Sequence, residues 1–147
     1  MKIRNGFVSN SSTSSFYIYG ICLDENRKGL AEKLKTNIPD EIKKAILTKN
    51  NEAAEKSSYR KAFDDFETYI DHFDEDSYEM LSEIANAVGL TMDHPEYCGF
   101  YMGIDPSDIG DDETGKEFKT RVETIIKSLL GEDITGFSWH AEAWRDG

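Results

Sequence analysis

The spacing of apolar residues between residues 118 and 144 constrains the fold of this chain more than any other feature. Apolar side chains recur every three to four residues from Phe118 to Leu130, which is typical of a helix with one buried face. Gly131 predicts the end of that helix. Residues 136–144 then place successive side chains on alternating sides, which predicts a strand.

Three further strands are expected. Residues 16–23 are rich in aromatic and β-branched side chains, as strands are. After Gly89 the pattern predicts a short strand, a turn over residues 93–96 that contains Pro95, and a longer strand over residues 97–105.

Helices are predicted between the first two of these strands. One covers about residues 26–36, and the next begins at Pro39 and ends near residues 48–52. A helix over about residues 76–88 follows, with Asp74 or Asp76 as its cap. Between the helix that begins at Pro39 and the helix over residues 76–88, a further helix is predicted. Five large apolar residues share one of its faces: Tyr59, Phe63, Phe66, Ile70 and Phe73.

The element order is therefore β-α-β-β-α-β with an enlarged first helical segment. We predict a single α+β domain over residues 1–147, in which helices cover one face of an antiparallel four-stranded sheet in the ferredoxin-like arrangement. Strands 16–23 and 97–105 form the central pair of that sheet.

The chain has a formal charge of −12, from 17 Lys and Arg against 29 Asp and Glu, and the charge is unevenly spread. Residues 1–50 hold nine basic and five acidic residues (+4), whereas residues 51–113 hold three basic and 18 acidic residues (−15). Such a chain repels nucleic-acid phosphates and attracts a basic partner protein. Solubility alone is a simpler explanation of the same charge.

Cys22 and Cys98 make neither a disulfide framework nor a zinc set, and no apolar run is long enough to span a membrane. The first ten residues lack an apolar core of the signal-peptide type. We therefore expect a cytoplasmic protein with reduced cysteines, and we expect no cofactor and no bound metal.

A hydroxyl-rich stretch, GFVSNSSTSSF, occupies residues 6–16. Its side chains bond readily to nearby backbone and favour turns, so we expect a compact loop pinned by apolar residues at both ends. Anion binding or modification of the hydroxyl groups is the alternative. The candidate residues are Ser9, Asn10, Ser11, Ser12, Thr13, Ser14 and Ser15.

The segment RNGFVSNSSTSSF resembles the opening of a group of uncharacterised phage and bacterial proteins that begin near GFVSNSSSSSF, with Thr13 in place of a serine. The segment DDETGKEFKTRVE and the ending EAWRDG are similar to tails found in that group. The resemblance implies a phage or prophage origin and a small accessory protein, and it implies no activity.

One face of the predicted sheet is a candidate binding surface if the tyrosines of its central strands share it. The residues of this face are Tyr17, Tyr19, Tyr101, His140 and Trp144. Aromatic patches anchor protein interfaces, whereas base stacking also needs cations that are lacking here. Coverage of the face by helices or by a second copy is the alternative.

His140 and Glu142 lie two residues apart on one strand face, which suits a metal-ligand pair or a base with its orienting carboxylate. A third ligand would have to come from Asp93 or His94. A solvated polar strand face is the alternative interpretation.

Residues 105–113 hold five carboxylates: Asp105, Asp108, Asp111, Asp112 and Glu113. Their spacing is not that of a calcium-binding EF-hand loop. We interpret the segment as a solvated loop in which Asp111 or Asp112 caps the following helix.

The leading hypothesis is a non-catalytic phage accessory protein that binds and occludes a basic host protein. It would use the aromatic sheet face or an acidic helix around residues 52–79, whose carboxylates would mimic nucleic-acid phosphates. The acidic candidates are Asp64, Asp65, Glu67 and Asp71. The alternative is a small enzyme or nucleotide-binding module that uses the serine stretch and the pair His140 and Glu142. A homo-oligomer is also left open.

Overall fold

A computed structural model describes residues 13–73, 77–93 and 99–145 of the 147-residue chain. Its α+β class agrees with the prediction. In chain order the elements are β1 (Thr13–Cys22), the 3-10 segment η1 (Leu23–Asn26), α2 (Leu30–Asn37), α3 (Asp40–Lys56), α4 (Phe66–His72), α5 (Tyr78–Ala87), β2 (Thr91–Asp93), β3 (Tyr101–Ile104), the 3-10 segment η2 (Pro106–Asp108), α6 (Gly115–Leu130) and β4 (Ser138–Arg145).

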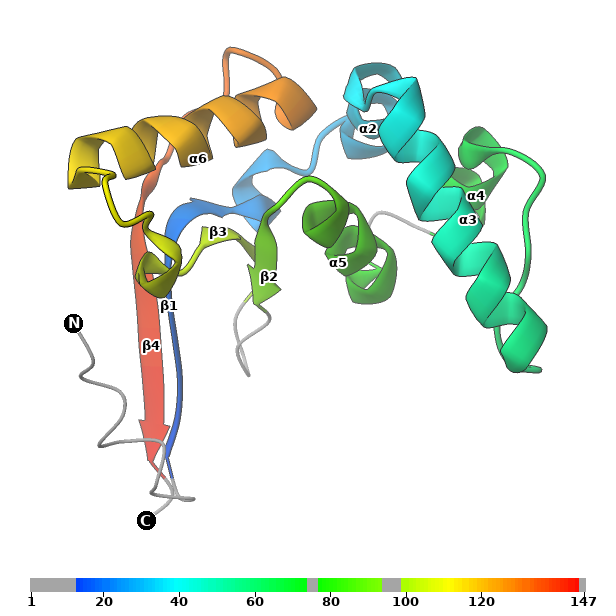
Figure 1. The fold of residues 1–147 in the computed structure, drawn as a ribbon, viewed down its shortest axis with the longest axis horizontal. Coiled ribbons are helices and arrows are strands. Elements are labelled where there is room, and N and C mark those ends of the chain that lie inside the picture. The colour runs from blue at the N-terminus through cyan, green and yellow to red at the C-terminus, as the bar shows by residue number, and fades with distance from the viewer. Residues whose placement is uncertain (1–12, 74–76, 94–98, 146–147) are drawn as a thin grey trace.

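The four strands form one antiparallel sheet in the order β2-β3-β1-β4, with β1 and β3 as the predicted central pair. β1 pairs with β3 only from Tyr19 to Cys22, but it pairs with β4 from Thr13 to Gly20. The β1–β4 ladder therefore extends past the two short strands, as Figure 1 shows.

The ferredoxin-like arrangement is not matched by the chain as a whole. Four α-helices and a 3-10 segment separate β1 from β2, where that arrangement has one helix. Figure 1 shows α2, α3 and α4 gathered at the end of the molecule away from the β1–β4 ladder. The long first connection thus builds a helical layer of its own. In this layer α2 contacts α6, and α5 contacts the edge strand β2 of the sheet.

The core extends from the helices α2 to α5 to a layer between α6 and one face of the sheet. Tyr19 and Ile21 of β1 are buried on this face beside their pairing partners Ile104 and Met102 of β3. The predicted apolar stripe of α6 covers them, with Ile125 half-buried at its margin. Its fully buried members are Phe118, Val122, Ile126, Leu129 and Leu130.

The first strand begins three residues before its predicted start. Residues 13–15 belong to β1 and not to the expected polar loop, because β4 gives each of them a partner: Arg145, Trp144 and Ala143. A neighbouring strand overrides the weak local preference of a hydroxyl-rich segment.

The helix break predicted at residues 48–52 was wrong, because α3 continues to Lys56. Asn50 is fully buried, and its side-chain nitrogen donates to the carbonyl oxygen of Lys61 at 2.9 Å. Asn51 donates to the carbonyl oxygen of Phe63 at 2.8 Å and accepts from its backbone nitrogen at 2.9 Å. Both amides bond to a neighbouring loop, so they do not compete with the backbone of their own helix.

The long helix predicted across residues 59–73 was also wrong. Residues 57–65 form a loop, in which Tyr59 is 99% exposed and Phe63 is buried, and only Phe66–His72 are helical. Asn51 occupies both backbone groups of Phe63, which removes this residue from any helical ladder. Asp65 then starts α4 by accepting from the backbone nitrogen of Thr68 at 2.7 Å.

The start of α5 falls two residues after the predicted one. Ser77 caps it by accepting from the backbone nitrogen of Met80 at 3.2 Å, whereas Asp74 and Asp76 lie outside the described residues. Gly89 has a φ of 86° and stops the helical segment as predicted.

The start of α6 also differs from the prediction. The side-chain oxygen of Thr114 accepts from the backbone nitrogen of Glu117 at 3.1 Å. In return, the Glu117 carboxylate accepts from the backbone nitrogen of Thr114 at 2.9 Å. This reciprocal cap leaves Asp111 and Asp112 in the loop before the helix. Gly131, with a φ of 110°, ends α6 as predicted.

Two further boundaries moved. The helix expected over residues 26–36 begins at Leu30, after a 3-10 turn, and the strand expected over residues 97–105 is restricted to Tyr101–Ile104. Asp105 ends β3 by accepting from the backbone nitrogen of Ser107 at 2.8 Å. Most of the turn predicted over residues 93–96 lies outside the described residues.

Candidate functional site

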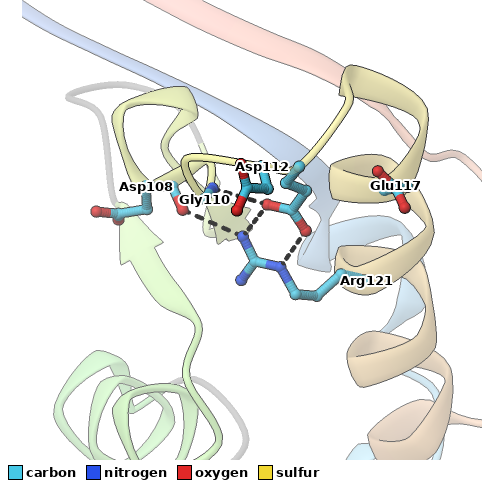
Figure 2. Close-up of a pocket in the computed structure, with 6 residues that line it drawn as sticks. Asp108, Gly110, Asp112, Glu117 and Arg121 are labelled. Atoms are coloured by element: carbon cyan, nitrogen blue, oxygen red, sulfur yellow. Dashed lines mark hydrogen bonds and ion pairs between the residues drawn. The ribbon is translucent and has the colours of Figure 1, made fainter.

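An open hollow of the described surface lies where the loop after β3 meets the first two turns of α6 (Figure 2). It is open to solvent, has a volume of about 580 Å³, and carries four carboxylates and one guanidinium group, for a formal charge of −3. Its lining residues are Asp108, Gly110, Asp112, Glu113, Glu117 and Arg121.

A two-point ion pair crosses the hollow. Arg121 Nε donates to Glu113 Oε2 at 2.8 Å and its Nη2 donates to Glu113 Oε1 at 2.9 Å. The same Nη2 donates to the carbonyl oxygen of Asp108 at 3.1 Å, and the Gly110 nitrogen donates to Glu113 Oε1 at 2.9 Å. These four hydrogen bonds, which we call the Arg121 brace, tie the loop to α6.

The brace fixes the charge of both partners. Hydrogen bonding to Arg121 and to the Gly110 backbone lowers the pKa of Glu113 to about 2. Hydrogen bonding to Glu113 raises the pKa of Arg121. Both groups are therefore charged at neutral pH, and the only guanidinium of the hollow is already engaged by a carboxylate.

Three exposed carboxylates of this loop form no ion pair with a described cation. Within residues 99–145, no described cation pairs with the side chains of Asp108, Asp111 or Asp112, all of which are exposed. Figure 2 shows the Asp108 carboxylate pointing away from the guanidinium group of Arg121. The rim of the hollow can therefore accept the ammonium or guanidinium groups of a basic partner.

The four acidic residues predicted on one helix do not form one helical face. Asp64 and Asp65 precede α4, and Asp65 is its cap. Asp71 accepts from Lys35 of α2 at 2.5 Å, which neutralises its charge locally. Asp64, Asp65 and Glu67 are exposed and lack a described cationic partner.

The predicted aromatic face is divided between the two sides of the sheet. Tyr17 stacks on Trp139 at 5.0 Å between ring centroids, and Tyr19 meets the same indole edge-on at 5.3 Å. Tyr101 instead contacts His140, at 4.9 Å, on the opposite side of the sheet. The expectation that Tyr17, Tyr19, Tyr101 and His140 share a face was wrong. The side chain of Trp144 lies outside the described part of the chain.

Tyr19 is also unavailable for binding because it belongs to the core. It is 6% exposed, and its hydroxyl donates to Glu123 Oε2 of α6 at 2.6 Å. Burial, followed by this hydrogen bond, raises the pKa of Tyr19 to about 12. The exposed aromatic pair is Tyr17 and Trp139, at 44% and 37%.

His140 is half-buried and has two neighbours at its Nε2 atom. The carbonyl oxygen of Gly20 and the Oγ atom of Ser138 each lie 3.2 Å away. A carbonyl oxygen can only accept, so Nε2 carries the proton in this contact and is not the base for the Ser138 hydroxyl. The side chain of Glu142 lies outside the described residues, as do Ser9, Asn10, Ser11 and Ser12. The backbone of Thr13, Ser14 and Ser15 lies in β1.

Two groups of polar residues were missed by the sequence reasoning. The reciprocal cap of α6 has a readable signal, a threonine followed three residues later by a glutamate, at Thr114 and Glu117. Arg121 and Glu113 lie eight residues apart, which is not a helical pairing distance, so their ion pair had no sequence signal.

Comparison of the chain with protein-family models, with curated proteins and with solved structures gives no match. In the part of the chain that the structure describes, no helix combines the length and the apolar character needed to cross a membrane. No group of three or more His, Cys, Asp or Glu side chains within the described ranges converges on a metal position.

Proposed function

We propose that this chain is a non-catalytic phage accessory protein that binds a basic host protein in the host cytoplasm and occludes it. What carries the proposal is the hollow beside α6, where the one lining cation is engaged internally and the exposed carboxylates of Asp108 and Asp112 have no ion-pair partner among the described residues. A partner that brings lysines or arginines to this rim would supply the missing countercharges.

The wider charge distribution supports the same conclusion. Residues 51–113 carry −15, and several of their partners, such as Lys35 and Arg60, are held in ion pairs within the molecule. Long-range attraction of a basic partner toward this half would increase the association rate, with carboxylates in the place of nucleic-acid phosphates.

The alternative, an enzyme or nucleotide-binding module built on His140, has less support. Its Nε2 atom faces the carbonyl oxygen of Gly20, so the neighbouring Ser138 lacks a base on that side. A thermal-shift screen with nucleotides and divalent metals tests this alternative, because a saturating ligand raises the melting temperature of the state that it binds.

The test of the proposed function begins with capture of a partner from host lysate at low salt, followed by its purification. We expect the affinity for that partner to fall steeply as salt is added, because the interaction is between exposed charges. The double variant Asp108→Asn with Asp112→Asn should weaken binding by about tenfold, which corresponds to about 1.4 kcal/mol.

A matched control removes two charges from the other end of α6. Glu132 and Asp133 are exposed and follow the C-terminal end of this 16-residue helix, about 24 Å from its start at 1.5 Å per residue. Glu132→Gln with Asp133→Asn should leave the affinity nearly unchanged. Binding that ignores salt, or that both double variants weaken equally, contradicts a role for the hollow.

A further inference from the structure

The outer edge of β4 is a second surface of this molecule, with a character opposite to that of the acidic hollow. β4 is the last strand of the sheet, and none of the described strands pairs with its outer edge. Such an edge presents a row of unpaired backbone donors and acceptors, which is a template for pairing with another strand.

The edge lacks several of the devices that usually prevent strand pairing. β4 runs for eight residues and pairs with β1 residue by residue, without an extra residue on either strand. It contains neither proline nor lysine, and its charged residues, Glu142 and Arg145, lie in its second half. Edge strands that must stay single are normally short, bulged or marked by lysine or proline.

One ring of the exposed aromatic pair, Trp139, belongs to this edge strand, whereas Tyr17 lies on the neighbouring β1. Trp139 of β4 stacks between Tyr17 and the buried ring of Phe118, and Lys119 Nζ lies 6.0 Å from its centroid. The ring is therefore fixed in position while 37% of the residue remains exposed. A fixed and partly exposed indole is typical of an interface anchor.

The ladder itself also lacks support. From Thr13 to Ile18, β1 pairs with β4 alone among the described strands, so this part of the sheet is two-stranded. Two-stranded ladders are marginally stable in water, and a third strand stabilises them. The sheet would gain that support if a further strand joined β4.

We propose that the edge of β4 pairs with the same edge of a second copy of this chain, in antiparallel orientation, to give a continuous sheet across a twofold axis. The sequence of β4 is complementary to itself in this arrangement. With the axis at Ala141, Trp139 is in register with Ala143 of the second copy, and His140 with Glu142 of the second copy. The large residue Trp139 thus lies opposite the small residue Ala143 in this register.

Charge explains why this edge suits a second copy and not the basic partner. Two copies at −12 each repel one another, so they can approach closely only where the surface has little net charge, as it has over β4, whose charged residues are one acidic and one basic, Glu142 and Arg145. A basic partner gains little from a strand without net charge. The pairing therefore strengthens as salt screens the repulsion, whereas binding at the acidic hollow weakens.

The test measures mass as a function of protein concentration and salt by analytical ultracentrifugation. We expect the native chain to move from 16.7 kDa toward twice that mass as its concentration rises, and to do so at lower concentration in high salt. Ala141→Lys places a charge at the exposed centre of the edge and should raise the dimer Kd at least about tenfold, or about 1.4 kcal/mol.

The matched control is Thr124→Lys, which adds the same charge at an exposed position of α6 and should dimerise like the native chain. A native chain that stays at 16.7 kDa overturns the proposal, as does a dimer that Ala141→Lys leaves intact. Hydrogen exchange of the native chain tests the pairing of two β4 edges without any variant. Protection of β4 amides that rises with concentration supports the pairing, and protection independent of concentration overturns it.

Discussion

Two arginines hold two loops in this molecule, and they do so in different surroundings. Arg60 ties the 57–65 loop to α3 and α5, through Asn50, Glu79 and Glu83. Arg121 ties the loop before α6 to α6 itself, through Glu113 and the Asp108 carbonyl. Both use a guanidinium group, carboxylates and a loop backbone, so a difference in their importance must come from location.

The Arg60 cluster is part of the interior. Asn50 is fully buried, the side chain of Glu83 is 16% exposed, and Glu83 also accepts from the hydroxyl of the buried Tyr69 at 3.1 Å. Burial and the Glu83 carboxylate raise the pKa of Tyr69, which keeps its hydroxyl protonated as a donor. The cluster joins segments that are distant in sequence, whereas the Arg121 brace closes a local loop at the surface. The first therefore supports the fold, and the second shapes a surface.

The largest expected effect is at Asn50. Asn50→Ala removes the acceptor of Arg60 and the donor of the Lys61 carbonyl from a site without solvent. Stranding buried polar groups costs about 1–3 kcal/mol, so the melting temperature should fall by several degrees. Asn86→Ala, at an exposed position of α5, is the control and should change stability by less than about 0.5 kcal/mol. Equal melting temperatures for the two variants would mean that the buried hydrogen bonds of Asn50 do not support the fold.

The next largest difference is between the arginines. Arg60→Met leaves Glu83 with little solvent and without its cation, and should destabilise the fold by about 1–3 kcal/mol. Arg121→Met should cost clearly less, because the Arg121 side chain is more exposed than that of Arg60, at 39% against 26%, although the side chains of Glu113 and Glu83 are about equally exposed, and exposed pairs contribute little. Parallel urea titrations of the two variants measure the difference. A larger loss for Arg121→Met would reverse the order that burial predicts.

These same two regions show what the sequence could and could not predict. The helix over residues 118–130 and its end at Gly131 follow from apolar spacing, and the structure confirms both. The break expected near Asn50 and Asn51 follows from their weak helix preference in isolation. In the structure both side chains instead hydrogen-bond to the backbone of a loop eleven and twelve residues further along the chain. The spacing of apolar residues is a local signal that the sequence contains. The hydrogen-bond partner of a polar side chain can instead lie in a distant segment that only folding brings close.

The candidate sites divide in the same way. Alternation along β4 correctly separated Trp139 from His140, because it depends on one strand. The prediction that Tyr17 and Tyr101 lie on one face of the sheet depends on the register between β1 and β3. The pattern within a single strand does not contain that register. The hollow at Arg121 depends on an ion pair between a loop and a helix, so the sequence supplied its carboxylates but not its geometry.

The Arg121 brace should appear in the pH dependence of stability. Because the folded-state pKa of Glu113 is lowered to about 2, its contribution is present above its unfolded pKa of about 4.3 and is lost as the pH falls toward 2. Glu113→Gln should therefore melt below the native chain at pH 7, by a small margin, and the two should converge near pH 2. Thermal melts across this range measure the effect. A margin that stays constant with pH would mean that the charge of Glu113 is not what stabilises the loop.

The smallest expected effect concerns a carboxylate that has no arginine. Burial, followed by the negative charge of Asp105, raises the pKa of Asp93 at the end of β2. A carboxyl group whose folded-state pKa is raised favours the fold below its unfolded pKa of about 3.9, and this contribution is lost as the pH rises through the folded-state pKa. Ionised Asp93 therefore opposes folding at pH 7.

Asp93→Asn should raise the melting temperature at pH 7 by no more than about 2–4 °C, which corresponds to about 1 kcal/mol for a chain of this size. The gain should disappear near pH 3, where the native carboxyl group is already protonated. Asp111→Asn removes the same charge from an exposed loop and serves as the control for net charge. If both variants gain equally, the cause is relief of the overall −12 charge and not the surroundings of Asp93. If only Asp93→Asn gains, then Glu113, which is bound by an arginine, and Asp93, which is not, contribute to stability at pH 7 with opposite sign.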